Sequence, residues 1–164
     1  MSFEIERKFL VTSDAWRPAV TKQIRLRQAY LTSDGKASIR VRIEDNRNAA
    51  LTVKSRNAAL RRLELEYKVP VLEAEAMFPL RRGSVIEKVR HHVPFGTLLW
   101  EVDVFAGENE GLVIAEVELE HENQHVDLPS WVGAEVTNLG QYYNGFLVQT
   151  PFRTWDKAKV EARG

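Results

Sequence analysis

Like-charged residues recur at alternate positions along this chain. Glu4 and Glu6 form an acidic pair near the start, and Arg40 and Arg42 form a cationic pair. On a β-strand, residues two apart point to the same face, so each pair would hold two like charges close together. Adjacent carboxylates raise each other's pKa, and a divalent cation turns that repulsion into binding. The spacing therefore indicates an oxygen-rich site suited to Mg²⁺ or Mn²⁺.

Most of the other charged residues also occur two positions away from a residue of the same sign, and most acidic and basic groups lie on different segments. Further acidic groups are Glu64 with Glu66, Glu101 with Asp103, and Glu116 with Glu118 and Glu120; further basic groups are Lys8, Lys54, and Lys88 with Arg90. Guanidinium groups bind phosphate oxygens through paired hydrogen bonds. Because the sequence has no Gly-rich phosphate loop, side chains would have to hold any phosphate. Carboxylates, a metal and these cations together fit a polyphosphate ligand.

These residues lie on segments in which apolar and polar residues alternate, which is the period of a β-strand. The segments are residues 3–10, 24–31, 37–43, 51–54, 63–69, 85–93, 98–105 and 112–120. Residues 33–35 predict a hairpin turn, and residues 45–50 and 106–110 predict loops, so neighbouring strands should be mostly antiparallel. Helical spacing occurs at residues 13–20, with Ser13 as N-cap, and at residues 72–80 and 139–148. The predicted fold class is α+β, with β-structure dominant.

If eight such strands close into a barrel, one face of every strand points inward. Either the apolar faces fill the interior and the charges are solvated, or the charges line a tunnel and the apolar faces are covered from outside. The first arrangement is the usual one, because burying charge is costly. The second fits the like-charge pairs, so spacing alone leaves both open.

Length and composition restrict the class of protein. The 164 residues suit one domain, and we expect residues 1–150 to form it and residues 151–164 to be a polar tail. The absence of cysteine excludes a disulfide scaffold, a thiolate zinc site and a cysteine nucleophile. Lys plus Arg is 23 and Asp plus Glu is 23, which argues against a nucleic-acid or membrane partner. The sequence starts without a signal-peptide pattern and has no long apolar run, so we expect a cytoplasmic protein.

The segment Glu4-Ile5-Glu6-Arg7-Lys8 resembles the ExExK signature of the CYTH superfamily, the triphosphate tunnel metalloenzymes. Later segments resemble the family's blocks in the same order, at residues 27–31, 39–42, 51–55, 64–66, 87–90, 101–105, 116–118, 135–137 and 142–144. The resemblance spans residues 2 to about 148 and is nearest to the short bacterial inorganic triphosphatases. It implies an eight-stranded antiparallel β-barrel with a charged lumen, the tunnel, and with helices packed outside.

The resemblance also implies a role for each matched residue. A divalent metal, Mg²⁺ or Mn²⁺, would be held by Glu4, Glu6, Asp103, Glu116 and Glu118, and the triphosphate by Lys8, Arg40, Arg42, Lys54, Lys88 and Arg90. Tyr30 and Lys54 match a pair associated in the family with phosphatase activity, so they are the predicted catalytic residues. Glu64 and Glu66 would position a second metal or fix the cationic side chains.

The implied reaction is metal-dependent hydrolysis of a phosphoanhydride, with inorganic tripolyphosphate as the expected substrate and pyrophosphate and phosphate as the products. Hydrolysis of thiamine or nucleoside triphosphate and a class IV-type adenylyl cyclase reaction are the alternatives within the same class. A polyphosphate-binding module without turnover and a structural barrel with solvated charges are the non-enzymatic alternatives. The expected partner is a small-molecule triphosphate, and a homodimer is left open.

Overall fold

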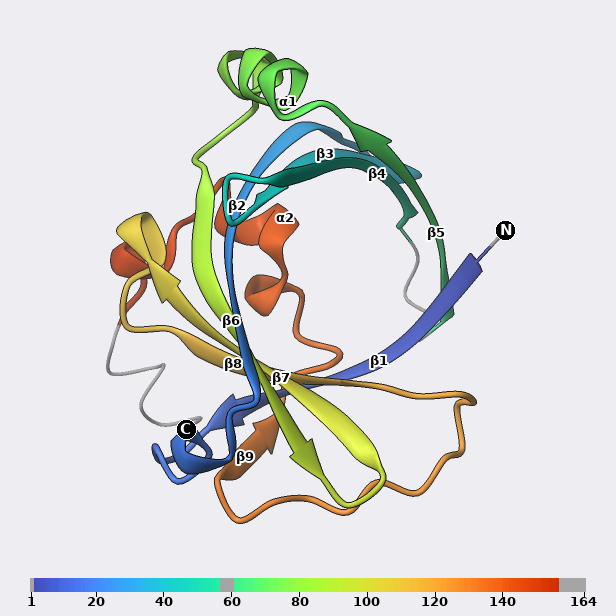
Figure 1. The fold of residues 1–164 in the computed structure, drawn as a ribbon, viewed down its shortest axis with the longest axis vertical. Coiled ribbons are helices and arrows are strands. Elements are labelled where there is room, and N and C mark those ends of the chain that lie inside the picture. Colours follow the sequence, from blue (N-terminus) through green and yellow to red (C-terminus); the bar gives the residue numbers. More distant parts are fainter. Residues whose placement is uncertain (1, 57–60, 157–164) are drawn as a thin grey trace.

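A computed structural model, which describes residues 2–56 and 61–156, contains one antiparallel sheet of nine strands. The strands are β1 (Ser2–Val11), β2 (Lys22–Ser33), β3 (Ala37–Glu44), β4 (Asn48–Ser55), β5 (Arg61–Val69), β6 (Ile86–Phe95), β7 (Leu98–Ala106), β8 (Val113–Glu118) and β9 (Val132–Glu135). Their order is β5-β4-β3-β2-β6-β7-β8-β1-β9, and β5 also pairs with β1. The first eight strands therefore close into a barrel, as predicted (Figure 1).

The two halves of strand β1 pair with different neighbouring strands, and this pairing closes the barrel. Its first half pairs with β5, so that Glu4 lies opposite Arg62, and its second half pairs with β8, so that Glu6 lies opposite Glu118. Where β5 no longer lies beside β1, β9 pairs with the end of β1, with Phe9 opposite Glu135. The acidic residues of the first strand are thus placed beside those of the eighth.

Short turns connect β2, β3 and β4 and fix their register. The Asp34 carboxylate accepts hydrogen bonds from the backbone N–H groups of Lys36 and Ala37, which makes the hairpin predicted at residues 33–35. Between β3 and β4, Asp45 and Asn46 have φ values of 51° and 56°. Two successive positive φ angles belong to the tight turn whose twist matches a β-hairpin. The register that follows places Arg40 opposite Tyr30 on one side.

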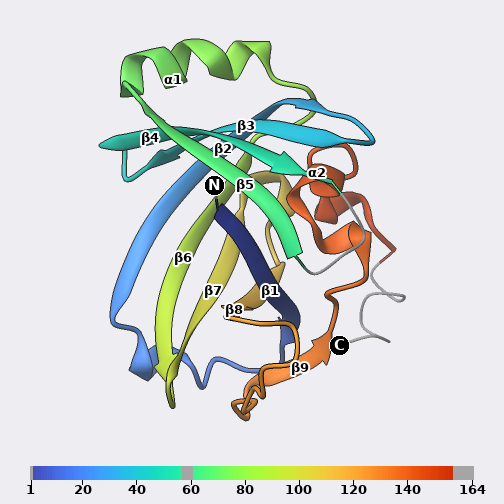
Figure 2. The same cartoon turned by 90° about the vertical axis from the view of Figure 1, so that its right-hand side faces the viewer.

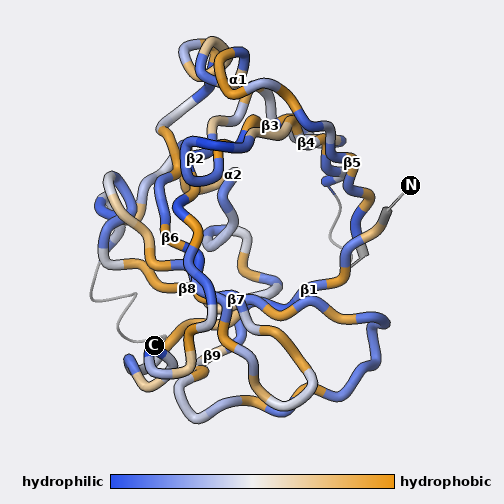
Figure 3. Tube along the Cα trace, viewed as in Figure 1, coloured by the Kyte–Doolittle hydropathy of each residue, from blue (hydrophilic) through white to orange (hydrophobic). Residues whose placement is uncertain are grey.

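The charged faces point into the barrel, where their side chains line a cavity, and most apolar faces point outward into clusters of buried residues. Figure 3 shows how hydrophilic and hydrophobic residues alternate along the strands. Outside β2, β3 and β4, Val41 and Ile43 pack against Ala74 and Phe78. Those two residues belong to α1 (Val71–Met77) and to the 3₁₀ turn Phe78–Leu80 that follows it. On the opposite side of the barrel, a second external cluster includes Trp100. Its other tryptophans are Trp16 and Trp131.

One end of the lumen is apolar instead of charged. Leu10 and Ile114 lie opposite each other on the inward faces of β1 and β8, one step beyond the charged pair Lys8 and Glu116. They pack with Leu147 of α2 (Asn144–Leu147) in one buried cluster. Figure 1, which looks into the barrel, shows α2 through the opening, and Figure 2 shows it at one end of the barrel. The C-terminal segment therefore packs into that end, whereas α1 lies outside.

The structure confirms the predicted helices only in part. Residues 72–80 are helical as expected, but residues 13–20 contain only the 3₁₀ turn Arg17–Ala19, because Pro18 cannot continue a helical hydrogen-bond ladder. Residues 139–148 form two short pieces, the 3₁₀ turn Gly140–Tyr142 and α2. Further 3₁₀ turns are Gly107–Asn109 and Phe152–Thr154. Strand β9 was not predicted.

The start of the segment predicted as a tail packs against the domain. Phe152 is buried in the cluster at the apolar end of the lumen, and its backbone N–H donates to Asn109 Oδ1 at 2.9 Å. Residues 157–164 of the predicted tail lie outside the described residues. None of the described helices is long and apolar enough to cross a membrane.

Candidate functional site: an ionic cavity inside the barrel

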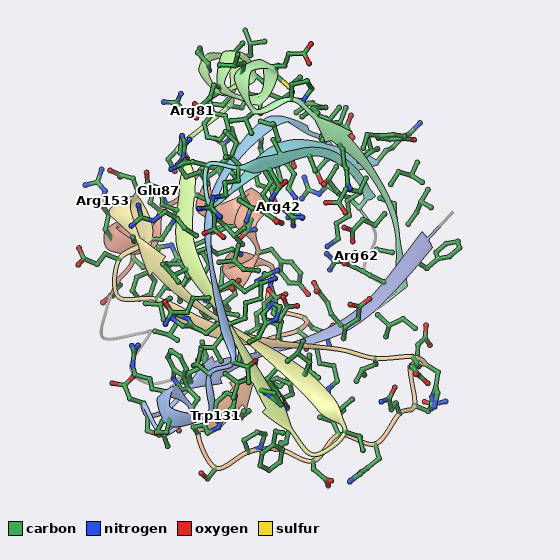
Figure 4. The ribbon with its side chains drawn as sticks, in the orientation of Figure 1. Arg42, Arg62, Arg81, Glu87, Trp131 and Arg153 are labelled. Atoms are coloured by element: carbon green, nitrogen blue, oxygen red, sulfur yellow. The ribbon has the colours of Figure 1, made fainter. Side chains whose placement is uncertain are left out.

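The inward faces of the strands line a cavity of about 1560 Å³, which we call the tunnel cavity. Its walls include eleven of the twelve residues that the sequence predicts for the site: Glu4, Glu6, Lys8, Tyr30, Arg40, Arg42, Lys54, Lys88, Arg90, Glu116 and Glu118. Figure 4 shows Arg42 inside the barrel opening, whereas Arg81, Glu87 and Arg153 lie outside the wall. Residues that are predicted for the site from distant segments of the sequence therefore meet in one cavity.

Two arginines on β3 present donors that the described protein groups do not use. The Nε atoms of Arg40 and Arg42 are buried and have no hydrogen-bond partner among the described residues. Arg42 Nη2 lies 2.7 Å from Glu66 Oε1 and 3.0 Å from Glu44 Oε1. Tyr30 lies opposite Arg40 across the β2–β3 pairing, and its influence helps to raise the pKa of Arg40 although burial lowers it. Buried donors without partners are costly, and phosphate oxygens are suitable acceptors for them.

The remaining predicted site residue, Asp103, is not among the residues that line the tunnel cavity. It is 1% exposed, and it is held between Lys88 Nζ at 2.7 Å and Arg90, whose Nε and Nη2 donate to it at 2.8 and 2.9 Å. Burial alone would raise the pKa of Asp103, but Arg90 and Lys88 outweigh it and lower that pKa. Both carboxylate oxygens are therefore occupied by the cations that Asp103 orients.

The acidic side of the cavity lies where β1 meets β8. Burial, reinforced by the charge of Glu116, raises the pKa of Glu6 to about 7. Burial also raises the pKa of Glu4 and, together with the charge of Glu4, that of Glu118. Crowded carboxylates of this kind are the donor set that a hard divalent cation binds. The residues present thus fit the chemistry of the predicted metal.

Two lysines already pair with these carboxylates. The Lys54 ammonium forms an ion pair with Glu4, and Lys8 Nζ lies 3.3 Å from Glu116 Oε1. Burial opposes ionisation of Glu116, but Lys8 and Arg90 hold its pKa well below the usual range. Within residues 2–56 and 61–156, no three acidic or histidine side chains stand at the spacing of a preformed metal site. Because the Lys54 ammonium already pairs with Glu4, a cation bound at Glu4 would compete with Lys54.

The cavity also contains residues that the sequence argument did not assign to the site. Arg56 and Arg62 line it, and the C-terminal segment contributes Thr137 and Tyr143. Figure 4 shows Arg62 pointing into the barrel opening. Arg62 precedes Glu64 by two positions on β5, so the same alternation that identified Glu64 could have identified it. Tyr143 lies outside the alternating strands, so that pattern gives no signal for it, although residues 142–144 match one of the family's blocks.

An ionic tunnel inside a closed antiparallel barrel defines the class of protein, and comparison with known sequences gives the family. Residues 2–146 match the CYTH domain, and the chain belongs to this family. A protein of Acetivibrio thermocellus named inorganic triphosphatase is 44% identical over 156 residues, which cover 94% of this chain and 99% of that protein. A protein of Nitrosomonas europaea with the same name is 37% identical over 149 residues, covering 88% and 95%.

Solved structures agree with the fold. The crystal structure of the inorganic triphosphatase NE1496 superposes with a TM-score of 0.67 at 34% identity, covering 92% of this chain and 97% of that chain. The PH1012 protein of Pyrococcus horikoshii gives a TM-score of 0.59 at 19% identity, covering 73% and 80%. At that lower identity the likeness concerns the fold alone.

Proposed function

We propose that the protein hydrolyses inorganic tripolyphosphate to pyrophosphate and phosphate with the help of Mg²⁺ or Mn²⁺. The observation that carries the proposal is one cavity with unbonded guanidinium donors on β3 and crowded carboxylates on β1 and β8. The names of the two relatives in Acetivibrio thermocellus and Nitrosomonas europaea support the same substrate. An inorganic chain of phosphates matches a cavity whose recognition groups are mostly ionic.

Glu4, Glu6, Glu116 and Glu118 are the proposed metal ligands. When bound, the cation would neutralise charge on the phosphate oxygens and on the carboxylates. We assign Asp103 a different part, because both of its oxygens already hold Lys88 and Arg90. Its proposed role is to orient those two cations toward the substrate.

The proposed cations act on the phosphate chain directly. Arg40, Arg42 and Arg90 bind phosphate oxygens through their guanidinium groups, and Lys8 and Lys88 add buried positive charge. The guanidinium groups of Arg40, Arg42 and Arg90 also stabilise the charge that develops as the phosphoanhydride bond breaks. Water is the nucleophile, and Lys54, released from Glu4, neutralises the departing phosphate. Tyr30 lies opposite Arg40 and favours its charged form.

Phosphate release from tripolyphosphate, thiamine triphosphate and ATP tests the proposal, with Mg²⁺, Mn²⁺ or a chelator present and with cyclic AMP measured in parallel. We expect release from tripolyphosphate to be fastest and to stop when the metal is chelated. Faster hydrolysis of either organic triphosphate would reassign the substrate, and cyclic AMP formation would reassign the reaction. Metal-dependent binding without any turnover would leave a polyphosphate-binding module.

Glu6→Gln supplies the site-directed part of the test. It removes one charged ligand without adding bulk, so we expect turnover to fall at least a hundredfold while the fold is kept. The matched control is Glu73→Gln on the exposed surface of α1, which should leave turnover unchanged. Activity of Glu6→Gln within a few fold of the wild type would remove Glu6 from the site.

A further inference from the structure

The ring of Tyr143 lies against two cations of the tunnel cavity. Lys8 Nζ is 4.0 Å from the ring centroid, and the guanidinium carbon of Arg62 is 4.6 Å from it. Both distances are within the range of favourable cation–π contacts. Lys8 comes from β1 and Arg62 from β5, so one aromatic side chain from the C-terminal segment contacts both strands at the place where the barrel closes.

The C-terminal segment also fixes the backbone and the ammonium of Lys8. The Lys8 N–H donates to Thr137 Oγ1 at 3.0 Å, and its carbonyl accepts from the Val136 N–H at 2.8 Å. The ammonium lies 3.5 Å from the carbonyl oxygen of Tyr142. Lys8 is 4% exposed, so these contacts determine where its charge stands.

The Tyr143 ring is itself held firmly. Its hydroxyl donates to the Thr137 carbonyl, and its own carbonyl accepts from the N–H groups of Phe146 and Leu147 at 3.0 Å each. Leu147 is fully buried in the apolar cluster at the end of the lumen. The ring therefore occupies a position set by the packed end of the barrel.

An aromatic face suits this position better than a carboxylate would. A carboxylate would hold Lys8 and Arg62 but would also cancel the positive charge that a polyphosphate needs. The ring attracts both cations through its quadrupole and adds no negative charge. The ring thus holds both cations without adding a second carboxylate to Lys8, which already pairs with Glu116.

We propose that Tyr143 is a positioning residue of the triphosphatase site, which holds Lys8 and Arg62 for contact with the phosphate chain. Arg62 is thereby a further substrate-binding residue. The inference rests on the proposed function for the identity of the substrate, but the arrangement of the three side chains does not depend on turnover.

Three variants separate positioning from folding. Tyr143→Leu removes the ring, Tyr143→Phe keeps the ring and removes the hydroxyl, and Tyr67→Leu makes the same change at an exposed tyrosine on β5 that does not line the cavity. Because the two cations would bind ground state and transition state alike, we expect Tyr143→Leu to raise KM for tripolyphosphate about tenfold, with kcat changed less than about threefold. Tyr143→Phe and Tyr67→Leu should stay within about twofold of the wild type.

A double-mutant cycle with Arg62→Ala supplies the decisive comparison. If the ring acts through Arg62, the effect of Tyr143→Leu on KM should shrink in the Arg62→Ala background. Additive effects would overturn the inference, and so would a Tyr143→Phe variant as impaired as Tyr143→Leu. An unchanged KM in a folded Tyr143→Leu protein would overturn it as well.

Measurements without turnover distinguish this inference from the proposed function. In the NMR spectrum, the side-chain protons next to the Lys8 ammonium should be shifted upfield by the ring in the wild type and in Tyr143→Phe, and should lose that shift in Tyr143→Leu. Calorimetric binding of tripolyphosphate in the presence of a chelator should weaken in Tyr143→Leu alone. A wild type that binds but does not hydrolyse would contradict the proposed function and leave the role of Tyr143 intact. The absence of the ring shift on Lys8 would contradict that role.

Discussion

Glu6 on β1 lies directly opposite Glu118 on β8, and both carboxylates line the tunnel cavity. Like charges placed opposite each other weaken a sheet. The arrangement is therefore a cost to the metal-free protein. It lies in a part of the cavity where burial and the charge of Glu116 raise the pKa of Glu6 to about 7.

The first prediction concerns stability against pH. Between about pH 4.5 and 7, the native protein keeps a proton on Glu6 that the unfolded chain releases, so the contribution of Glu6 to the free energy of unfolding falls as pH rises through this window. The loss is on the order of 3 kcal/mol, and the raised pKa values of Glu4 and Glu118 act in the same direction. Urea unfolding of the metal-free protein at several pH values measures it. Glu6→Gln should flatten the dependence, and an unchanged slope in that variant would contradict the assignment.

A second prediction concerns cation binding by the same carboxylates. At pH 8, Mn²⁺ without substrate should raise the melting temperature of the wild type, because a ligand that binds only the native state stabilises it. Glu118→Gln should lose most of this increase. Glu120→Gln is the matched control, since Glu120 lies two positions further along the chain and does not line the tunnel cavity. Equal increases in the two variants would exclude Glu118 as a ligand.

Asp103 provides a third prediction, because it holds buried cations. Asp103→Ala would remove the carboxylate that pairs with Lys88 and would leave Arg90 only its contacts with Glu101 at 3.2 Å and Glu116 at 3.9 Å. We expect it to lower the free energy of unfolding by about 3–5 kcal/mol. Asp103→Asn keeps the shape of the side chain and should cost less. If Asp103 positions cations and binds no metal, the increase in melting temperature with Mn²⁺ should persist in Asp103→Asn. Its loss there would return Asp103 to the set of metal ligands.

The fourth prediction separates Lys54 from the metal ligands. Lys54→Ala should lower kcat for tripolyphosphate by about 10² or more, as expected for a group that assists the leaving phosphate. Because the substitution also frees Glu4 from its ion pair, Mn²⁺ binding should be retained or tightened. Lys68→Ala, at an exposed lysine on β5, is the control. A wild-type rate in Lys54→Ala would refute the catalytic role of Lys54.

A fifth prediction tests the covering of the barrel from outside. Phe78 packs against the apolar outer faces of β2, β3 and β4, and the guanidinium of Arg27 lies over its ring. Phe78→Ala should lower the free energy of unfolding by about 3 kcal/mol or more, because it leaves a cavity. KM should not change, since Phe78 is outside the tunnel. A large change in KM at unchanged stability would mean that the 3₁₀ turn Phe78–Leu80 affects the site.

Much of the fold could be predicted because the pattern of the strands is simple. The alternation of Arg40 and Arg42 with Val41 and Ile43 fixes the period of β3, and the same reading holds for each of the eight barrel strands. Strand β9 was not predicted because its four residues are too few to establish a period. The helix expected at residues 13–20 was wrong because the pattern was given more weight than Pro18.

The sequence predicted which strand faces carry the charged residues, but not which of these side chains form ion pairs with one another. Alternation places Asp103 and Glu101 on the same face, yet only Glu101 lines the cavity. That difference depends on Lys88 and Arg90, which approach Asp103 from the neighbouring strand β6, and strand alternation does not specify which carboxylate a cation selects. The contribution of Tyr143 depends on the path of a C-terminal segment without a regular period.

The division of β1 between two neighbours sets the order in which the protein can mature. Glu4 and Glu6 precede Glu116 and Glu118 by more than one hundred residues in the sequence. Such distant pairings form slowly, since a long loop must close before any contact rewards it. A nascent or truncated chain that lacks β8 therefore cannot bring together the four carboxylates that we propose as metal ligands, so the proposed cation site forms only after β8 has been translated.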